Sequence, residues 1–343
     1  MVAEAVEFGT GLLRTTVRRT VHGYRWSRAP GPDAPSPFAA VSPGTAALLA
    51  GLPAVPGTDR AAGTGWLLGE EDGRGHRHYS ARSPLSAARL LLPGDRRADG
   101  APPTALVDAV TGLGALLARL HRTPLPPGTP PPAPSRALRR LHAWLTDDSP
   151  VPGAELLRDA LGAQRHNTLI RGCSAALAPG DDGVLCHGAP GLGSLLPGGP
   201  GGAAAVFIGE DLCLAPPATD LGWLVGELIG LRWSLGAGAP EVWQRLVDAA
   251  AAGYGATAEV SDSFWPALRV AVRVHDTVAY RPRPPDAVIP RFAPLLRGLL
   301  DASGLHTSDR FPGLDPGPGP GPGPGPGPGR GRGRGRGRGP RGR

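Results

Sequence analysis

The sequence predicts an α+β protein of two lobes, and three observations support this. The first segments are rich in Thr, Val and Arg, which favours strands. Near residue 100 the pattern changes to leucines spaced three and four apart, which favours helices, and two short apolar segments interrupt the helical part near its middle. We expect a β-rich lobe at residues 1–95, a mostly helical lobe at 96–312, and a disordered Pro-Gly and Gly-Arg tail at 313–343.

The first lobe shows alternating strand patterns and one helix start. Strand patterns cover residues 10–28, 63–69 and 76–92, the last of which also fits a strand followed by a helical turn. Ser42 stands before a Pro-Gly pair, which predicts the start of a short helix at Thr45–Leu52.

The second lobe is predicted to consist mainly of helices. Residues 103–121 form an amphipathic pattern, a Pro-rich connector follows at 124–134, and Ser135 is suited to cap the next helix. A further helix at 153–177 should break near Gly162. The remaining predicted helices are Leu221–Trp233, Glu241–Tyr254, Ser263–Tyr280 and Pro290–Ser303.

The positive charge is local. All 36 basic residues are arginine, and the net charge of +7 equals the seven arginines of residues 330–343, which include no acid. The remainder is therefore neutral, and only the tail is a candidate polyanion binder. Weak nucleic-acid contact by the Gly-Arg tail is one interpretation, and a GC-rich repeat of little function is the other.

The cysteines and the apolar segments indicate a cytoplasmic protein. Cys173, Cys186 and Cys213 show no CxxC spacing, which is typical of reduced thiols. The N-terminus has no pattern of a secretory signal, and no uninterrupted apolar stretch reaches 18 residues, so we expect no membrane segment.

Two loops carry the functional signal. The first runs from His187 as His-Gly-Ala-Pro-Gly-Leu-Gly-Ser-Leu, which places a serine at Ser194. The second reads Phe-Ile-Gly-Glu-Asp and ends in the carboxylates Glu210 and Asp211, and an Asp-Leu pair follows at Asp220. Each loop lies beside an apolar strand candidate.

These residues resemble the aminoglycoside phosphotransferase and choline kinase-like family, whose fold is protein kinase-like. The family's catalytic loop reads His-Gly-Asp-x-x-x-x-Asn-Leu and aligns from His187 without a gap. Its second loop, Ile-Asp-x-Glu, precedes an Asp-Leu pair that matches Asp220-Leu221, and Leu117–His121 fits its Leu-Ala-x-Leu-His segment. The motifs cover about residues 100–235, and the resemblance implies that the two loops face one groove between the lobes.

The departures from the family concern the chemistry. The family's catalytic Asp falls on Ala189, which cannot accept a proton, and its Asn falls on Ser194. Its metal-binding Asp falls on Ile208 or Gly209. The chain contains no lysine, so the residue that pairs with nucleotide phosphates must be an arginine or be absent.

The resemblance implies a set of candidate site residues. His187, Ser194 and Asp220 are the catalytic-loop candidates, Glu210 and Asp211 the candidate magnesium ligands, and Arg25 and Arg28 the candidate contacts to ATP. Plainer interpretations stand beside these: a packed histidine at 187, a helix cap at Asp220 and a solvated turn at 210–211.

Two functions therefore remain open. In the first, the protein transfers the γ-phosphoryl group of ATP, with Mg²⁺, to a hydroxyl group of an antibiotic-like small molecule or of a Ser or Thr in a precursor peptide of secondary metabolism. In the second, it is a pseudokinase that binds such a substrate or supports a partner, such as a lyase or another modification enzyme, without phosphoryl transfer. The same loops serve both.

Overall fold

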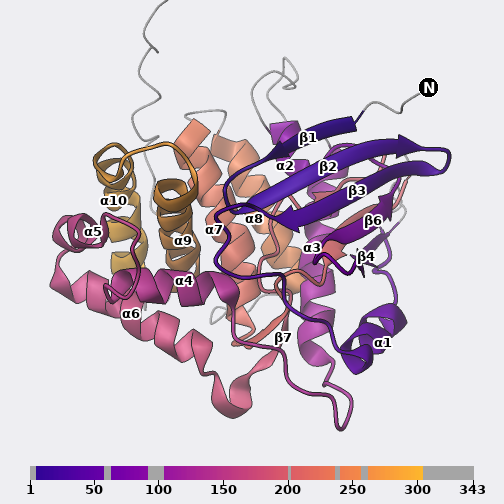
Figure 1. Cartoon of the computed structure of the whole chain (residues 1–343), viewed down its shortest axis with the longest axis horizontal. Helices are drawn as coiled ribbons and strands as arrows, with labels where there is room; N and C mark the ends of the chain where they lie inside the picture. Colours follow the sequence, from indigo (N-terminus) through magenta and orange to yellow (C-terminus); the bar gives the residue numbers. More distant parts are fainter. Residues whose placement is uncertain are drawn as a thin grey trace, which may run out of the picture.

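The computed structural model describes residues 5–57, 63–91, 104–199, 202–235, 240–255 and 262–303. Figure 1 shows a twisted sheet at one side of the molecule and a group of helices at the other, with α3 and α8 between them. The α+β class and the two-part arrangement are therefore confirmed. The predicted boundary at 95/96 and the predicted tail lie outside the described residues.

An antiparallel five-stranded sheet forms the N-terminal part, in the order β1-β2-β3-β6-β5. Its strands are β1 (Ala5–Gly9), β2 (Leu13–Thr20), β3 (Gly23–Pro30), β5 (Glu70–Glu71) and β6 (Arg77–Ala81). Val17, Trp26 and Tyr79 are buried on its inner face, because side chains alternate across a strand and the register sets these three side by side.

Helix α1 (Pro43–Gly51) follows this sheet's third strand, and its start is the one predicted. The hydroxyl of Ser42 accepts a hydrogen bond from the Thr45 amide at 3.1 Å, which satisfies one of the free N–H groups of the first turn. The short helix α2 (Ala87–Leu91) follows β6, as the alternative of a strand followed by a helical turn predicts.

The C-terminal part consists of helices, as predicted. They are α3 (Thr104–Arg122), α4 (Arg136–Leu145), α5 (Ala154–Leu161), α6 (Ala163–Leu177), α7 (Ala218–Leu235), α8 (Pro240–Tyr254), α9 (Phe264–Tyr280) and α10 (Pro285–Ala302). The expected break falls at Gly162, which has φ of 80°. Ser135 caps α4 by accepting a hydrogen bond from Leu138, and the α3 leucines are fully buried.

Four short strands, rather than the two expected, support the loops between α6 and α7. β7 (Val184–Cys186) pairs with β10 (Cys213–Ala215), and β8 (Leu195–Leu196) pairs with β9 (Ala204–Ile208). Strands of two or three residues leave too little alternation to be recognised in a sequence.

A fifth short strand links the two parts of the molecule. β4 (Thr64–Leu68) was expected in the N-terminal lobe, and it pairs in parallel with β9. The strand itself was predictable, but its partner was not, because alternation shows that a segment is extended and does not show what it pairs with.

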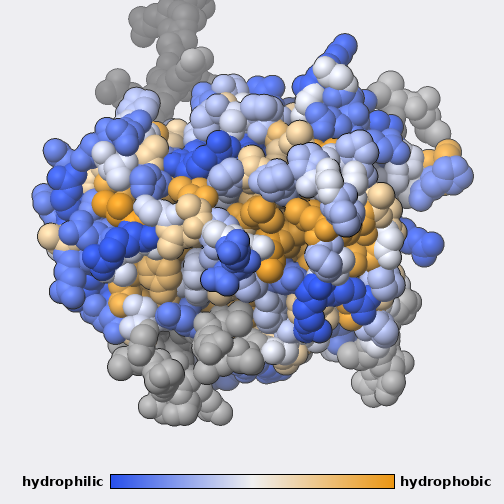
Figure 2. Space-filling view, turned by 90° about the horizontal axis from the view of Figure 1, so that it is seen from below, coloured by the Kyte–Doolittle hydropathy of each residue, from blue (hydrophilic) through white to orange (hydrophobic). Residues whose placement is uncertain are grey.

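The outer surface mixes charged and apolar groups. Seen from below, apolar residues gather in a central band, with hydrophilic residues toward the edges (Figure 2). Within the described ranges, none of the helices combines the length and the apolar character needed to cross a bilayer.

Candidate functional site

The two loops of the sequence motif face one cleft of about 280 Å³. His187, Ala189 and Ser194 line it from the loop between β7 and β8, and Glu210 and Asp211 line it from the turn after β9. The pairings of β7 with β10 and of β8 with β9 bring these segments together. The expectation of adjacent loops on a shared groove is confirmed.

Asp220 braces the first loop. Its side chain is fully buried, and its two carboxylate oxygens accept hydrogen bonds from the amides of His187 at 2.7 Å and Gly188 at 2.9 Å. The ring of His121 bonds to the same carboxylate at 3.0 Å. Hydrogen bonds to a charged group contribute about 1.5–3 kcal/mol each, so this brace fixes the loop strongly. Because α7 already begins at Ala218, a role for Asp220 as helix cap is not observed.

The ring of His187 stabilises the same loop from inside. Its Nε2 bonds to the carbonyl oxygen of Phe207 at 2.7 Å, and its Nδ1 lies 3.4 Å from the amide of Ala189. A neutral ring with its proton on Nε2 satisfies both contacts. His187 therefore links the first loop to the strand that precedes the second.

Gly188 allows the two loops to touch. Its φ is 87°, and a Cβ there would collide with the carbonyl oxygen of Asp211. Only glycine accepts both conditions without strain. The adjacent Ala189 is half-buried and offers a methyl group to the cleft at the position of the family's catalytic Asp.

The serine at the family's asparagine position bonds back into its own loop. The hydroxyl of Ser194 donates to the carbonyl oxygen of Gly191 at 2.9 Å, and its side chain is buried. A hydroxyl that donates still has lone pairs to offer, and Ser194 also lines the cleft, so its assisting role stays a prediction.

Neither residue at the family's metal-binding position offers a ligand to the cleft. Ile208 is buried in an apolar cluster with Leu49, Leu120 and Leu185. Gly209 has no side chain and adopts φ of 111°. The nearest carboxylates are therefore Glu210 and Asp211, as the sequence indicates.

Glu210 is already engaged on both of its oxygens. Tyr79 donates its hydroxyl to Oε1 at 2.7 Å, and the guanidinium of Arg28 lies 3.0 Å from Oε2. The side chains of Arg28 and Glu210 are 11% and 9% exposed, so this is a largely buried ion pair. Burial first, and the nearby Glu210 second, raises the pKa of Tyr79, which keeps its hydroxyl proton available for the bond.

Asp211 is held in the same way by the first turn of α4. Arg136 bonds to its Oδ1 at 2.8 Å and also donates to the carbonyl oxygens of Glu210 and Ser36. The guanidinium lies over the ring of Phe38, 5.6 Å from its centroid. Arg136 therefore fastens the second loop to the segment before α1.

Two further ion pairs form the far end of the cleft. Arg140 lies 3.3 Å from Asp276, and Arg269 lies 3.6 Å from Glu227 with its guanidinium 4.6 Å from the ring centroid of Trp223. Burial acts to raise the pKa of Asp276, but the hydrogen bond from His275 and the charge of Arg140 lower it below its ordinary value.

The charges of the cleft thus cancel in pairs. Its described lining contains four arginines and four carboxylates, and each carboxylate is held by one arginine. Magnesium takes one or two carboxylates and competes poorly for groups that a guanidinium already neutralises. The residues present therefore do not fit the magnesium site that the family implies.

An aromatic group closes the sheet side of the cleft. Trp26 lies two residues before Arg28 on β3, so both side chains point to the inner face. Its ring packs edge-on against Phe207, on which Tyr79 stacks with centroids 4.1 Å apart. The indole N–H donates to the carbonyl oxygen of Ser83 at 2.9 Å. Trp26 lines an apolar hollow of about 660 Å³, whereas Phe207 lines the cleft.

The two arginines suggested for ATP lie differently. Arg28 lines the cleft, with its guanidinium 5.8 Å from the ring centroid of Phe207. Arg25 is exposed, and it lies on the opposite face of β3 from Trp26. The structure therefore brings Arg28, and not Arg25, to the other candidate residues.

Sequence reasoning missed the arginines of α4 and α9 that complete the cleft. One signal was present for Arg136: a cation in the first turn of a helix is disfavoured by the helix dipole and implies a nearby anion. Arg140 follows four residues later and so shares its helix face. Nothing in the sequence connected Arg269 to Glu227, because two different helices, α9 and α7, supply the two groups.

Comparison with known proteins identifies the family. The family described as the phosphotransferase enzyme family matches residues 66–263, more than half of the chain, and the chain belongs to it. The suspected relationship to aminoglycoside phosphotransferases and choline kinases is confirmed.

Two solved structures show the same fold. The choline kinase LicA from Streptococcus pneumoniae has 12% identity and a TM-score of 0.51, with 88% of this chain and 95% of that chain covered. The amicoumacin kinase hAmiN, solved in complex with AMP-PNP, Ca²⁺ and Ami, has 12% identity and a TM-score of 0.52, covering 85% of this chain and 87% of that chain. Among curated protein sequences, none matches.

Proposed function

We propose that this protein is a pseudokinase-like binding module of the phosphotransferase family. Its interlobe cleft binds a hydroxyl-bearing small molecule or peptide without magnesium-dependent phosphoryl transfer. The observation that carries the proposal is that every described carboxylate of the cleft is neutralised by its own arginine.

The remaining chemistry of the loops supports the same function. Phosphoryl transfer needs a positioned base and metal ions that neutralise developing charge. Ala189 supplies no base, and Ile208 and Gly209 supply no metal ligand. Trp26 is buried on the inner face of the sheet, two residues before Arg28, in a cluster with Val17, Tyr79 and Phe207.

The cleft keeps what binding requires. Its paired arginines and carboxylates offer both donors and acceptors to hydroxyl, amide and charged groups of a ligand. Trp223 and Phe38 add apolar surface on two sides. Such a mixed lining suits a polar small molecule or a peptide segment, and a bound peptide would be presented to a separate modification enzyme.

The ligand candidates follow from this chemistry and from the family. Antibiotic-like small molecules and Ser- or Thr-containing precursor peptides remain the two classes, with a lyase or similar enzyme as the proposed partner. A cytoplasmic location is part of the proposal and is supported by three free, buried cysteines.

A transfer assay tests the catalytic part. The full chain is incubated with γ-labelled ATP, Mg²⁺ and a panel of aminoglycosides, choline and Ser/Thr peptides, beside the Asp211→Asn and Asp147→Asn variants. We expect no label in any acceptor. Transfer that is lost in Asp211→Asn but kept in Asp147→Asn, an exposed acid, would establish the phosphotransferase alternative.

A binding assay tests the other part. Thermal shifts with the same panel are measured in EDTA and in Mg²⁺. We expect at least one panel class to stabilise the protein equally in both buffers, and Glu227→Gln to weaken that effect. Stabilisation that appears only with Mg²⁺ would contradict the proposal.

A further inference from the structure

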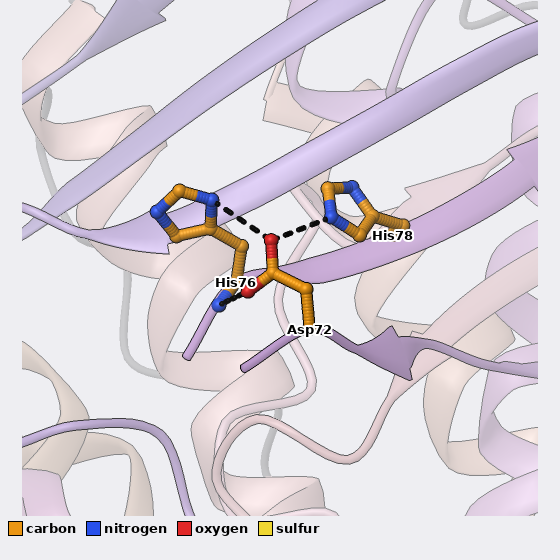
Figure 3. A group of neighbouring side chains, drawn as sticks. All are labelled: Asp72, His76 and His78. Carbon is orange, nitrogen blue, oxygen red and sulfur yellow. Dashed lines mark hydrogen bonds and ion pairs between the residues drawn. The ribbon is translucent and has the colours of Figure 1, made fainter. Parts of the chain in front are cut away.

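Three potential metal ligands meet at the turn between β5 and β6, outside the lining of the cleft. Figure 3 shows the rings of His76 and His78 on either side of the Asp72 carboxylate. One carboxylate oxygen, Oδ2, lies 3.4 Å from Nδ1 of His76 and 3.1 Å from Nε2 of His78. All three donor atoms lie within 4.8 Å of one another.

The spacing matches the edge of a zinc coordination shell. Zinc bonds to histidine nitrogen and carboxylate oxygen at about 2.0–2.2 Å, so neighbouring ligands of a tetrahedron lie about 3.3 Å apart. The separations of Asp72 Oδ2 from the two histidine nitrogens lie on either side of that value, and the two nitrogens lie within 4.8 Å of each other. An ion can therefore enter between the three donors with only small side-chain rotations.

The hairpin pre-positions the donors. Oδ1 of Asp72 accepts hydrogen bonds from the amides of Arg74 at 2.9 Å and His76 at 3.0 Å, which fixes the carboxylate and leaves Oδ2 facing the histidines. The backbone N–H of His76 is also the main reason that the pKa of Asp72 is lowered to about 2, so the carboxylate is charged at neutral pH. His78 lies on β6 and His76 directly precedes that strand; both rings face Asp72, whereas the intervening Arg77 is buried.

A partner outside the turn orients one ring. Nδ1 of His78 lies 2.9 Å from the hydroxyl of Ser27 on β3, the strand that neighbours β6. With an ion bound, Nδ1–H donates to this hydroxyl and the lone pair of Nε2 faces the ion. Metal-binding histidines are commonly oriented by such a bond through their second nitrogen.

We propose that Asp72, His76 and His78 form a binding site for a divalent ion of the zinc class, with water in the fourth position. Oδ2 of Asp72, Nδ1 of His76 and Nε2 of His78 are the ligands, and each ring then carries its proton on the nitrogen that faces away from the ion. The ion closes the β5–β6 turn and, through Ser27, fixes it to β3. The donors are 33%, 40% and 17% exposed, which leaves a path for the ion from solvent.

A second cluster of the described residues, His121, Cys186 and Asp220, contrasts with this one. There the carboxylate already accepts two loop amides, and His121 also bonds to Tyr254. Burial raises the pKa of Cys186 well above its ordinary value, so no thiolate is at hand. That cluster serves the brace of the first loop.

Zinc titration of the tag-free, EDTA-treated full chain tests the proposal by calorimetry. We expect one equivalent to bind, and we expect Asp72→Asn and His78→Gln to weaken binding roughly 10- to 100-fold. Loss of a ligand should weaken binding at least as much as loss of a side chain that orients a ligand. The amide oxygen introduced by Asp72→Asn can still accept from the two turn amides, so this variant should fold. His22→Ala, at an exposed histidine in another turn, should bind zinc like the wild type.

A variant that keeps all three ligands and an absorption spectrum of the bound zinc test the proposal further. Ser27→Ala should weaken zinc binding roughly 10-fold while leaving all three ligands in place. X-ray absorption at the zinc edge should show two imidazoles and oxygen ligands. Binding that is unchanged in Asp72→Asn and His78→Gln, no binding at all, or sulfur in the coordination shell would each overturn the proposal. The cleft has no part in this site, so its result is independent of the proposed function.

Discussion

The ion pair between Arg28 and Glu210 separates the two functions most clearly, and its strength can be worked out from the structure. If Glu210 is a structural partner of Arg28, removing the arginine leaves a carboxylate uncompensated at a position that is only 9% exposed. Breaking a buried pair in this way costs about 3–5 kcal/mol. We therefore expect Arg28→Met to lower the free energy of unfolding by that amount.

The double variant distinguishes this pair from a weak surface contact. Glu210→Gln keeps the hydrogen bond from Tyr79 and removes only the charge. Combined with Arg28→Met, it should recover part of the loss, because no charge then remains unpaired. The interaction energy should lie in the upper part of the range of about 0.5–3 kcal/mol seen for contacting residues.

Urea unfolding at equilibrium, followed by circular dichroism, gives the free energy of unfolding of the wild type, of the two single variants and of the double variant. Arg158 and Asp147 provide the control, since they lie 2.6 Å apart but are 39% and 56% exposed, and a pair so exposed is worth less than about 1 kcal/mol. An interaction energy for Arg28 and Glu210 as small as that of the control would refute the reasoning. Glu210 would then be available to bind a cation.

Three further predictions concern the loops, the aromatic closure and a buried histidine. Gly188→Ala should destabilise the protein by roughly 1–3 kcal/mol because of the left-handed backbone, and the clash of the new Cβ with Asp211 adds to this loss. Gly193→Ala, whose new Cβ would meet no atom within 4 Å, should be nearly neutral when both variants are compared by thermal unfolding. Trp26→Ala should cost about 3–5 kcal/mol and enlarge the apolar hollow, and added indole or adenine should raise the Tm of this variant but not of the wild type. Burial, with the charge of Arg158, lowers the pKa of His166, so the unfolded chain binds the proton more readily and stability should fall as the pH drops below about 6.5. His166→Phe should flatten this slope in urea titrations, and an unchanged slope would exclude His166 as its source.

The sequence was sufficient to predict the two loops of the site, but not the ion pairs between its side chains. The match of the residues from His187 to Asp220 to the family's motifs was sufficient to place two loops against one groove. The empty position at Ala189 could also be read directly.

The ion pairs could not be predicted from the sequence, for a physical reason. Arg28 and Glu210 lie far apart in the sequence, and the packing of the sheet against β9 alone brings them together. Both members of such a pair read as ordinary polar residues in the sequence. The carboxylates Glu210 and Asp211 therefore looked like metal ligands until their partners were visible.

The zinc-class site was missed for a related reason. Its three ligands lie close together in the sequence, but their spacing follows no common zinc motif, and only the hairpin turn brings Asp72 back to His78. Strand alternation does predict that His76 and His78 share a face, and this was the available signal.

Titration of Mn²⁺ against the full chain in the presence of ADP, with the free ion followed by electron paramagnetic resonance, tests the central claim most directly. The His76→Ala/His78→Ala variant is used so that the hairpin contributes no site. Because each cleft carboxylate belongs to an arginine, the signal of free Mn²⁺ should equal that of a protein-free solution with the same ADP, which itself binds part of the ion. Loss of one equivalent of that signal, restored by Asp211→Asn, would contradict the account.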